Sequence, residues 1–390
     1  MRVIVCQRGA RHRYAVPRIL EEGGILEALY TDSCEKSILG RLTNFLPFKW
    51  GALGRLAGRK VTGISEKRFK ASDRIAFQTL MGRQLDFSED CIRWGLRDAD
   101  WVYSMFGSEL GFLRHAKSSG LKIAVDVIIN PLCYRIVANE VSRVGPWGRG
   151  SHSTGEQQNI MEGYMREVFS LSDSLLCPCK SVVDGLCEFM PSVAGRAVVL
   201  PYGSSLSLVE SPSSPVPGRV LFVGTDPVRK GMHYFAEAAA LVRQELPNSE
   251  FVVAGMSSDD VIGMPFAEEL TFLGRLPMNL IHEEFARAQV FCLPSLAEGQ
   301  AGVVLEALAA GCPVVATREA GVDLCHGYNG MLVSSRDANG LGNCLRQVIQ
   351  DVELRERLVK NGRNLASEVY SEQAWKWRLL EFFRSAAERS

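Results

Sequence analysis

The feature that most constrains this chain is a strand, turn and helix pattern in its second half. An apolar run at 290–293 predicts a buried strand, and a turn at 294–302 leads into an Ala- and Leu-rich helix over about 301–310. Gly311 ends this helix, and a second apolar strand is expected at 314–317. Strands that alternate with helices in this way are typical of a parallel α/β sheet.

Two carboxylates belong to this pattern, Glu298 in the turn and Glu306 in the helix, with seven residues between them. The start of a helix offers unpaired amides and a partial positive charge, so we expect an anionic group to bind beside Gln300, Ala301 and Gly302. One ligand could then meet both carboxylates and the amides between them. This arrangement is the outline of a nucleoside diphosphate site.

These residues are part of a longer series of motifs in a fixed order. A K-G turn lies upstream of E-x7-E, which is followed by A-x-G-x-P-V-V-A-T and N-G-x-L-V. The series resembles the donor-sugar signature of retaining glycosyltransferases of family 4, over about residues 219–335. The resemblance implies the GT-B fold of class α/β, in which two doubly wound Rossmann-like domains face a central cleft and the C-terminal helix crosses back to the first domain.

The length of 390 residues and the 46% apolar content suit two domains. We expect an acceptor-binding Rossmann-like domain at 1–203 and a Ser- and Pro-rich linker at 204–218. A domain that binds a nucleotide-sugar donor is expected at 219–368. The final helix, 369–390, is expected to pack on the first domain.

The loop GTDPVRKG, which follows an apolar strand at 219–223, is a second place for phosphate. The resemblance implies that an Arg and a Lys of this loop hold the donor diphosphate. Lys230 matches the Lys, whereas Thr225, directly after Gly224, stands where the family has its Arg. Arg229 lies next to Lys230 and is the candidate substitute.

The resemblance also implies roles for individual residues. Glu306 would bind the ribose hydroxyls, and Glu298 would hold the sugar hydroxyls and stabilise an oxocarbenium-like transition state. Lys230 would neutralise the departing phosphate, and the backbone near Arg275 and Leu276 would contact the base. The implied reaction moves a sugar from a nucleotide-diphosphate donor to a hydroxyl of a glycan, a lipid-linked glycan or a small molecule. It retains the configuration and needs no metal or other cofactor.

Many family members carry a His after the strand that corresponds to 122–129. This stretch contains Asp126 and Asn130 instead, and no general base is assigned. The pair Asp98 and Asp100 forms a D-x-D, but it precedes a strand and is interpreted as a structural corner.

The loop after the first strand is strongly basic, with Gly9 among Arg8, Arg11, His12 and Arg13. Two interpretations stay open. In one, Gly9 and Arg11 belong to a loop that binds an anionic acceptor or a phosphate; in the other, the loop is a solvated basic surface.

Residues 40–75 carry nine Lys and Arg against Glu66 and Asp73, interleaved with Phe, Trp and Leu. Such a segment can lie on an anionic membrane surface. The alternative is a helical insertion at the surface whose apolar side packs on its own domain. The basic residues are Arg41, Lys49, Arg55, Arg59, Lys60, Lys67, Arg68, Lys70 and Arg74.

Lys and Arg total 44, as do Asp and Glu, so nothing in the overall charge indicates a nucleic-acid partner. The eleven cysteines are dispersed without zinc-site spacing, which favours a reducing compartment. No apolar run is long enough to span a bilayer. We therefore expect a cytoplasmic protein, with peripheral contact to the inner face of the membrane through 40–75. Its expected partners are a nucleotide sugar and a glycan or lipid-linked acceptor.

Three alternatives were weighed. A non-enzymatic GT-B-like module that binds a nucleotide or glycan stays open, because Thr225 and the missing His depart from the family pattern. A nucleotide-sugar 2-epimerase would use the same fold with acidic and His residues in the front-domain cleft. A dinucleotide-dependent oxidoreductase is disfavoured, because no G-x-G-x-x-G follows a strand.

Overall fold

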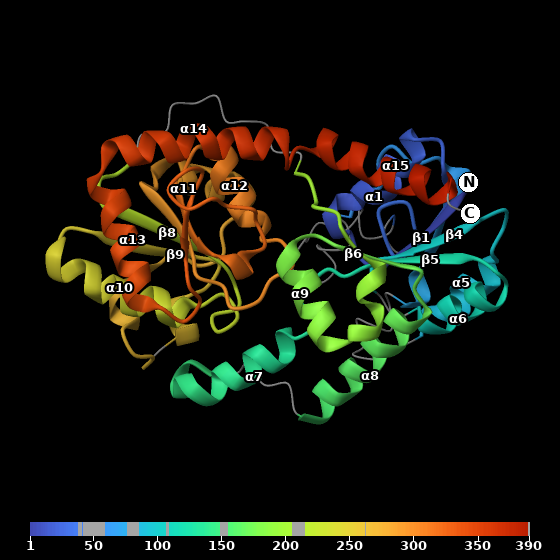
Figure 1. Ribbon diagram of the computed structural model, residues 1–390, viewed down its shortest axis with the longest axis horizontal. Helices are drawn as coiled ribbons and strands as arrows, with labels where there is room; N and C mark the ends of the chain where they lie inside the picture. The colour runs from blue at the N-terminus through green and yellow to red at the C-terminus, as the bar shows by residue number, and fades with distance from the viewer. Residues whose placement is uncertain are drawn as a thin grey trace.

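The computed structural model describes residues 1–37, 41, 59–75, 86–106, 109–148, 155–204, 215–261 and 263–388. Within these ranges the chain forms two lobes, each built on a parallel sheet with helices packed against it (Figure 1). The predicted fold class, two doubly wound α/β domains, is confirmed. We call the two lobes the N domain and the C domain.

The N domain contains a seven-stranded sheet in the order β3-β2-β1-β4-β5-β6-β7. Its strands are β1 (Val3–Gln7), β2 (Leu26–Asp32), β3 (Phe69–Ser72), β4 (Trp101–Ser104), β5 (Lys122–Asp126), β6 (Ser174–Cys177) and β7 (Ala197–Val199). Its helices are α1 (Ala15–Glu22), α5 (Ser88–Trp94), α6 (Leu110–Ser118), α7 (Cys133–Val144), α8 (Gly155–Leu171) and α9 (Lys180–Phe189).

The C domain contains a six-stranded sheet in the order β10-β9-β8-β11-β12-β13. Its strands are β8 (Arg219–Val223), β9 (Glu250–Ala254), β10 (Leu270–Phe272), β11 (Val290–Leu293), β12 (Val314–Thr317) and β13 (Met331–Val333). The helices that follow β8 are α10 (Met232–Glu245), α11 (Met278–Arg287), α12 (Gly302–Ala310), α13 (Ala338–Gln350), α14 (Val352–Glu368) and α15 (Glu372–Glu388).

The central strands of the C domain follow directly from their sequences. Every residue of β8, β11 and β12 is buried. A parallel strand covered by helices on both faces reads as a continuous apolar run, which is why these strands have the predicted bounds. In each sheet the order changes direction beside the first strand, and the carboxyl ends at this switch point are where ligands bind in such folds.

The alternative interpretation of 40–75, a helical insertion at the surface, is wrong for the last part of this segment. Residues Phe69–Ser72 form β3, which pairs with β2 at the edge of the sheet. Residues 42–58, which hold the aromatic part of the proposed membrane-binding segment, lie outside the described residues. Among the described basic residues, Arg59, Arg68 and Arg74 form ion pairs within the N domain.

The chain passes between the domains at two neighbouring points. Ser204 donates its amide to the carbonyl of Tyr370 (2.8 Å), and Glu372 donates its amide to Ser204 (3.2 Å). Helices α14 and α15 follow one another along one side of the molecule, and α15 ends beside the N-terminus (Figure 1). Trp375 and Phe383 of α15 belong to the apolar core of the N domain. The last helix therefore completes the N domain.

Helix α7 extends from the N domain to the C domain and carries a fully buried carboxylate, Glu140. Arg336 donates its Nε to Glu140 Oε2 (2.6 Å), and His233 Nε2 lies 3.3 Å from Oε1. Tyr234 donates its hydroxyl to the same oxygen. Burial alone would raise the pKa of Glu140, but these three C-domain partners more than offset it and bring the pKa to about 2.

We expect Glu140→Gln to lower the free energy of unfolding by roughly 3 kcal/mol at pH 7, because the variant leaves Arg336 without its buried partner. The folded-state pKa of Glu140 lies below the ordinary value, so its contribution is present above about pH 4.5 and is lost as the pH falls toward 2. Denaturant unfolding should therefore show that the difference in the free energy of unfolding between the wild type and Glu140→Gln becomes smaller from pH 7 to pH 3.

Glu167→Gln is the matched control, because Glu167 forms an exposed pair with Arg114. Its effect should stay within about 1 kcal/mol. Equal losses in the two variants would contradict the role of Glu140.

Candidate active site

Two loops meet at the carboxyl ends of the neighbouring strands β8 and β11. Gly231, at the end of the 224–231 loop, has a φ of 71°, and a Cβ there would lie 2.0 Å from the carbonyl oxygen of Pro294. Leu296 donates its amide to the carbonyl of Arg229 (2.8 Å). This close packing needs glycine, and it sets the cationic residues of the first loop against the turn at 294–302.

Glu298 is held by both cations of the first loop. Lys230 Nζ lies 2.8 Å from Glu298 Oε1, and Arg229 Nη1 lies 2.6 Å from Oε2, with all three side chains less than a fifth exposed. Burial alone would raise the pKa of Glu298, but the charges of Lys230 and Arg229 more than offset it, and the pKa lies below its usual value. Glu298 is therefore ionised and shared by two cations.

The structure also shows which way Arg229 points. Its Nε donates to Asp226 Oδ2 (2.9 Å) and its Nη1 to the carbonyl of Ala297 (3.1 Å), so the side chain extends along the turn beside Lys230. Thr225 is exposed, and a Cβ at Gly224 would meet the Lys230 stem at 2.3 Å. Arg229 thus brings a second positive charge to Glu298, although Thr225 stands where the family has its Arg.

The start of α12 offers fewer free amides than expected. Ala301 donates its amide to the carbonyl of Ala320 (2.9 Å). Within the described part of the chain, the amides of Gln300 and Gly302 have no hydrogen-bond acceptor. Two of the three expected amides can therefore receive an anion.

The side chain of Gln300 joins the turn to the N domain. Its Oε1 accepts from the amide of Tyr202 (3.0 Å), and its Nε2 donates to the carbonyl of the same residue (3.1 Å). Gln300 therefore fixes the turn to the last segment of the N domain before the chain leaves it.

A cavity of about 820 Å³ lies between the two domains and includes Glu306. Burial raises the pKa of the Glu306 carboxyl, and the positive charge of Arg13 opposes this shift. Gln300 and Gly302 line the same cavity, whereas Glu298, Arg229 and Lys230 do not. The turn thus contacts the two cations of the 224–231 loop through Glu298 and borders the cavity through Gln300 and Gly302.

The cavity draws on both domains. Helix α11 contributes Met278 and His282, a few residues after the predicted contacts Arg275 and Leu276, which do not line it. The lining from the N domain and the interdomain crossing is Ala10, His12, Arg13, Ala15, Arg18, Lys60, Thr62, Tyr202, Gly203, Ser204, Glu372 and Trp375.

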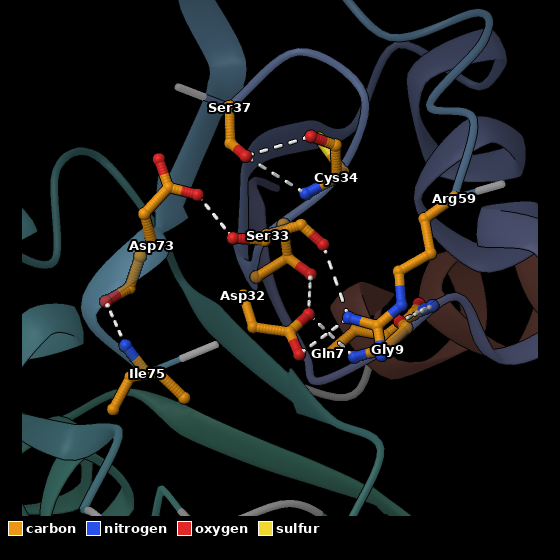
Figure 2. Close-up of polar contacts among 11 residues, drawn as sticks. Gln7, Gly9, Asp32, Ser33, Cys34, Ser37, Arg59, Asp73 and Ile75 are labelled. Carbon is orange, nitrogen blue, oxygen red and sulfur yellow. Dashed lines mark hydrogen bonds and ion pairs between the residues drawn. The ribbon is translucent and has the colours of Figure 1, made fainter. Parts of the chain in front are cut away.

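The predicted phosphate loop is already bound to its own domain. The amide of Gly9 donates to Asp32 Oδ1 (2.9 Å), and Arg59 Nη1 donates to Asp32 Oδ2 (2.8 Å). Figure 2 shows the Asp32 carboxylate between Gly9 and Arg59. Arg11 does not line the cavity. Asp32 therefore occupies the amide that a phosphate would use, and the cavity side of this loop is formed by His12 and Arg13.

Asp126 and Asn130, at the place of the missing His, have structural partners. Asp126 is buried and accepts hydrogen bonds from the hydroxyls of Tyr202 (2.5 Å) and Tyr103 (3.0 Å). Burial raises its pKa to about 6, and the two tyrosines partly offset the effect. Asn130 caps its own turn through the amide of Leu132. Asp126 therefore fixes the position of Tyr202, which lines the cavity, and has no direct place in the cavity wall itself.

His12 is a cavity residue that the sequence analysis did not assign. Its ring lies 4.3 Å from that of Tyr202 and 5.3 Å from that of Trp375, centroid to centroid. The loop that places it has three successive residues with left-handed backbone angles, which no local pattern in the sequence indicates.

Gly299 is packed on all sides where the domains meet. A Cβ on Gly299 would lie 1.9 Å from the carbonyl oxygen of Ile128 in the N domain. Its own carbonyl accepts from Cys179 Sγ (2.9 Å), and Asn130 donates its amide to the carbonyl of Glu298 (3.3 Å). The position of the turn therefore depends on the docking of the two domains.

Comparisons with known proteins concern the C domain and the fold. Residues 217–351 match the family model described as "Glycosyl transferases group 1". The chain is 32% identical over 178 residues to the phosphatidyl-myo-inositol mannosyltransferase of Mycolicibacterium smegmatis, covering 43% of this chain and 46% of that protein. It is 30% identical over 161 residues to the lipopolysaccharide core biosynthesis glycosyltransferase LpsE of Rhizobium meliloti, covering 40% and 46%. The chain thus spans about half the length of the related proteins that it matches.

Solved structures match over nearly the whole chain. HepE of Anabaena, in complex with UDP and glucose, superposes with a TM-score of 0.64 at 13% identity, covering 99% of this chain and all of that one. Sucrose-phosphate synthase of Thermosynechococcus elongatus superposes with a TM-score of 0.67 at 14% identity, covering both chains fully. The C domain therefore matches the glycosyltransferase group 1 model, and the whole chain has the GT-B fold.

Two further findings concern the described residues only. No three His, Cys, Asp or Glu side chains among them are grouped so that they could hold a metal ion. None of the helices in this part of the chain is long and apolar enough to cross a membrane.

We expect Gly299→Ala to disturb the docking of the domains, because its methyl group would lie on the Ile128 carbonyl. The free energy of unfolding should fall by about 1–3 kcal/mol, as for other overpacked sites. The radius of gyration from small-angle X-ray scattering should rise as the domains separate. Gly302→Ala is the control, since a Cβ there meets nothing within 4 Å. The same scattering curve for both variants would argue against this role.

Proposed function

We propose that this protein is a glycosyltransferase that moves a sugar from a nucleotide-diphosphate donor to a hydroxyl acceptor, with retention of configuration and without a metal ion. The observation that carries the proposal is the turn at 294–302. This turn holds an ionised Glu298 shared by Lys230 and Arg229 and two open amides, and the helix α12 that follows it carries Glu306 at the border of an interdomain cavity.

The comparisons support the donor class. Among proteins with a similar fold, HepE has been solved with UDP and with UDP-glucose, and the pneumococcal O-GlcNAc transferase GtfA with UDP and GlcNAc. The names of the related proteins include a lipopolysaccharide core biosynthesis glycosyltransferase, a phosphatidyl-myo-inositol mannosyltransferase and a D-inositol 3-phosphate glycosyltransferase. We therefore expect a nucleotide sugar as donor and a glycan, a lipid-linked glycan or a small molecule as acceptor.

In the proposed complex, Glu306 accepts hydrogen bonds from the ribose hydroxyls inside the cavity. The amides of Gln300 and Gly302 bind the diphosphate at the start of α12, where the helix dipole adds to the attraction. Lys230 and Arg229 are then shared between the diphosphate and Glu298. The sugar hydroxyls donate hydrogen bonds to Glu298. These bonds compensate Glu298 for the part of its contact with Lys230 and Arg229 that the diphosphate takes over.

The transfer step breaks the bond between the anomeric carbon and the β-phosphate oxygen, and the electron pair stays with the departing diphosphate. Lys230 and Arg229 stabilise the charge that builds there. The acceptor oxygen attacks the same face of the sugar, and its proton passes to the leaving phosphate oxygen. This front-face route gives retention without a separate general base, in keeping with the buried and engaged Asp126.

The proposal also covers where the protein works. We propose a cytoplasmic protein with peripheral contact to the membrane through 40–75, which rests on the charge and aromatic content of that segment. Binding to vesicles with and without anionic lipid would test this part separately.

We expect one of UDP, GDP and ADP to stabilise the wild type against heat, and Glu306→Ala to lose this effect because the ribose hydroxyls lose their acceptor. At about 100 times the dissociation constant, the ligand should add roughly 2.7 kcal/mol. The affinity should also weaken as the pH falls, starting at a higher pH than for an ordinary Glu, because the pKa of Glu306 is raised. Differential scanning fluorimetry and calorimetric titration measure both effects.

Glu356→Ala is the control for this experiment, since Glu356 is exposed on α14, far along the chain from the turn. If no nucleotide stabilises the wild type, the donor site is disproved. Binding without any transfer to glycan acceptors would favour the non-enzymatic module.

A second pair of variants separates binding from turnover. Glu298→Gln should lower turnover by roughly 100-fold through the loss of transition-state stabilisation. It should leave nucleoside diphosphate affinity equal or higher, because Lys230 and Arg229 no longer neutralise a carboxylate. Lys230→Gln should instead lower the affinity for the nucleoside diphosphate. Steady-state kinetics with calorimetry on both variants measures this contrast, and a parallel loss of affinity in the two would refute it.

A further inference from the structure

The cavity wall that belongs to the N domain carries three cations, Arg13, Arg18 and Lys60. Arg18 Nη2 binds Glu372 Oε1 at 2.5 Å, so its charge is balanced within the wall. Across the described ranges, the guanidinium of Arg13 and the ammonium of Lys60 have no hydrogen-bond or ion-pair partner. Among the described residues, these two positive charges thus face the cavity without a direct ion-pair partner, and Arg13 interacts at longer range with Glu306.

Arg13 is held toward the cavity by its neighbours. His12, Arg13 and Tyr14 have φ angles of 47°, 52° and 58°, a left-handed run that is costly for residues other than glycine. Tyr14 is fully buried in the core of the N domain, and the His12 ring packs at a tilt of 44° against the ring of Tyr202. Tyr14 and His12 thus fix the backbone on either side of Arg13, whose exposed side chain lines the cavity together with His12.

The opposite wall provides little positive charge to this cavity. Arg229 and Lys230 do not line it and are bound to Glu298, and Thr225 supplies no cation. The carboxyl on that side, Glu306, senses the charge of Arg13. An anion in the cavity would therefore find counter-charges on the N domain, in addition to the Lys230 and Arg229 that a diphosphate reaches at the turn.

We propose that Arg13 and Lys60 form a phosphate subsite on the N-domain side of the cavity, so that substrate binding joins the two domains through a charged group. The proposal rests on the function proposed above. The phosphate can come from two sources with the same chemistry, the diphosphate of the donor or a phosphate group on the acceptor. Neither residue was assigned by the motifs, which pointed to Gly9 and Arg11.

The variants are Arg13→Gln, Lys60→Gln and the double variant, with Arg13→Lys to test whether charge alone restores binding. Lys70→Gln is the matched control, because it removes an exposed N-domain charge on β3 outside the cavity. Thermal unfolding without ligand confirms that each variant folds. Lys60→Gln leaves the strained loop untouched, so it tests the subsite even if substitution of Arg13 prevents folding.

Calorimetric titrations compare UDP, GDP and ADP with uridine, guanosine and adenosine, and inorganic phosphate is titrated with the bound nucleotide present. If the donor supplies the phosphate, Arg13→Gln lowers the affinity for the nucleoside diphosphate roughly tenfold or more and leaves the affinity for the nucleoside unchanged. If the acceptor supplies it, diphosphate binding stays and saturable binding of phosphate is lost.

The proposed subsite would be refuted if the double variant bound both the diphosphate and phosphate with wild-type affinity. Failure of the proposed function has a different signature: no nucleoside or nucleotide binds the wild type, and Glu306→Ala changes nothing. Phosphate titrated into the wild type and the double variant still decides on the subsite in that case.

Discussion

The candidate site depends on one close contact, that of Gly299 with the backbone of the N domain. The space for a Cβ at this position is filled by the carbonyl of Ile128, so the turn and the N domain approach as closely as two backbones can. Glu298 and Gln300 flank this glycine on either side, and each bonds to the N domain as well. The orientation of the carboxylate and of the open amides is therefore a property of the docked domains and not of the C domain alone.

The turn and the helix α12 that follows it place two carboxylates in opposite electrostatic environments. Glu298 lies between two cations that lower its pKa, and Glu306 lies in a cavity whose burial raises its pKa. A carboxylate that is firmly ionised suits the stabilisation of positive charge, whereas one that is only weakly compensated suits the acceptance of hydrogen bonds from neutral hydroxyls. The spacing of seven residues thus separates two chemical tasks along one ligand.

Much of the C domain could be predicted from the sequence, because a buried parallel strand is a continuous apolar run whose ends are visible. Strands β11 and β12 begin and end where expected. Strand β3 was missed because FKAS at a sheet edge has no such pattern. The position of Arg229 and Lys230 followed from their loop. The bond between Gln300 and Tyr202 could not, since it joins residues 98 positions apart through the docking of two domains.

The N domain is completed by α15, the last helix of the chain, whose Trp375, Leu379 and Phe383 are part of its core. Synthesis proceeds from the N-terminus, and domains that can do so fold as they emerge. Here the N domain keeps an apolar face open until α15, which follows the C domain in the chain, has been made. Folding of the two domains during synthesis is thus coupled, and the N domain has to avoid aggregation while the whole C domain is being made.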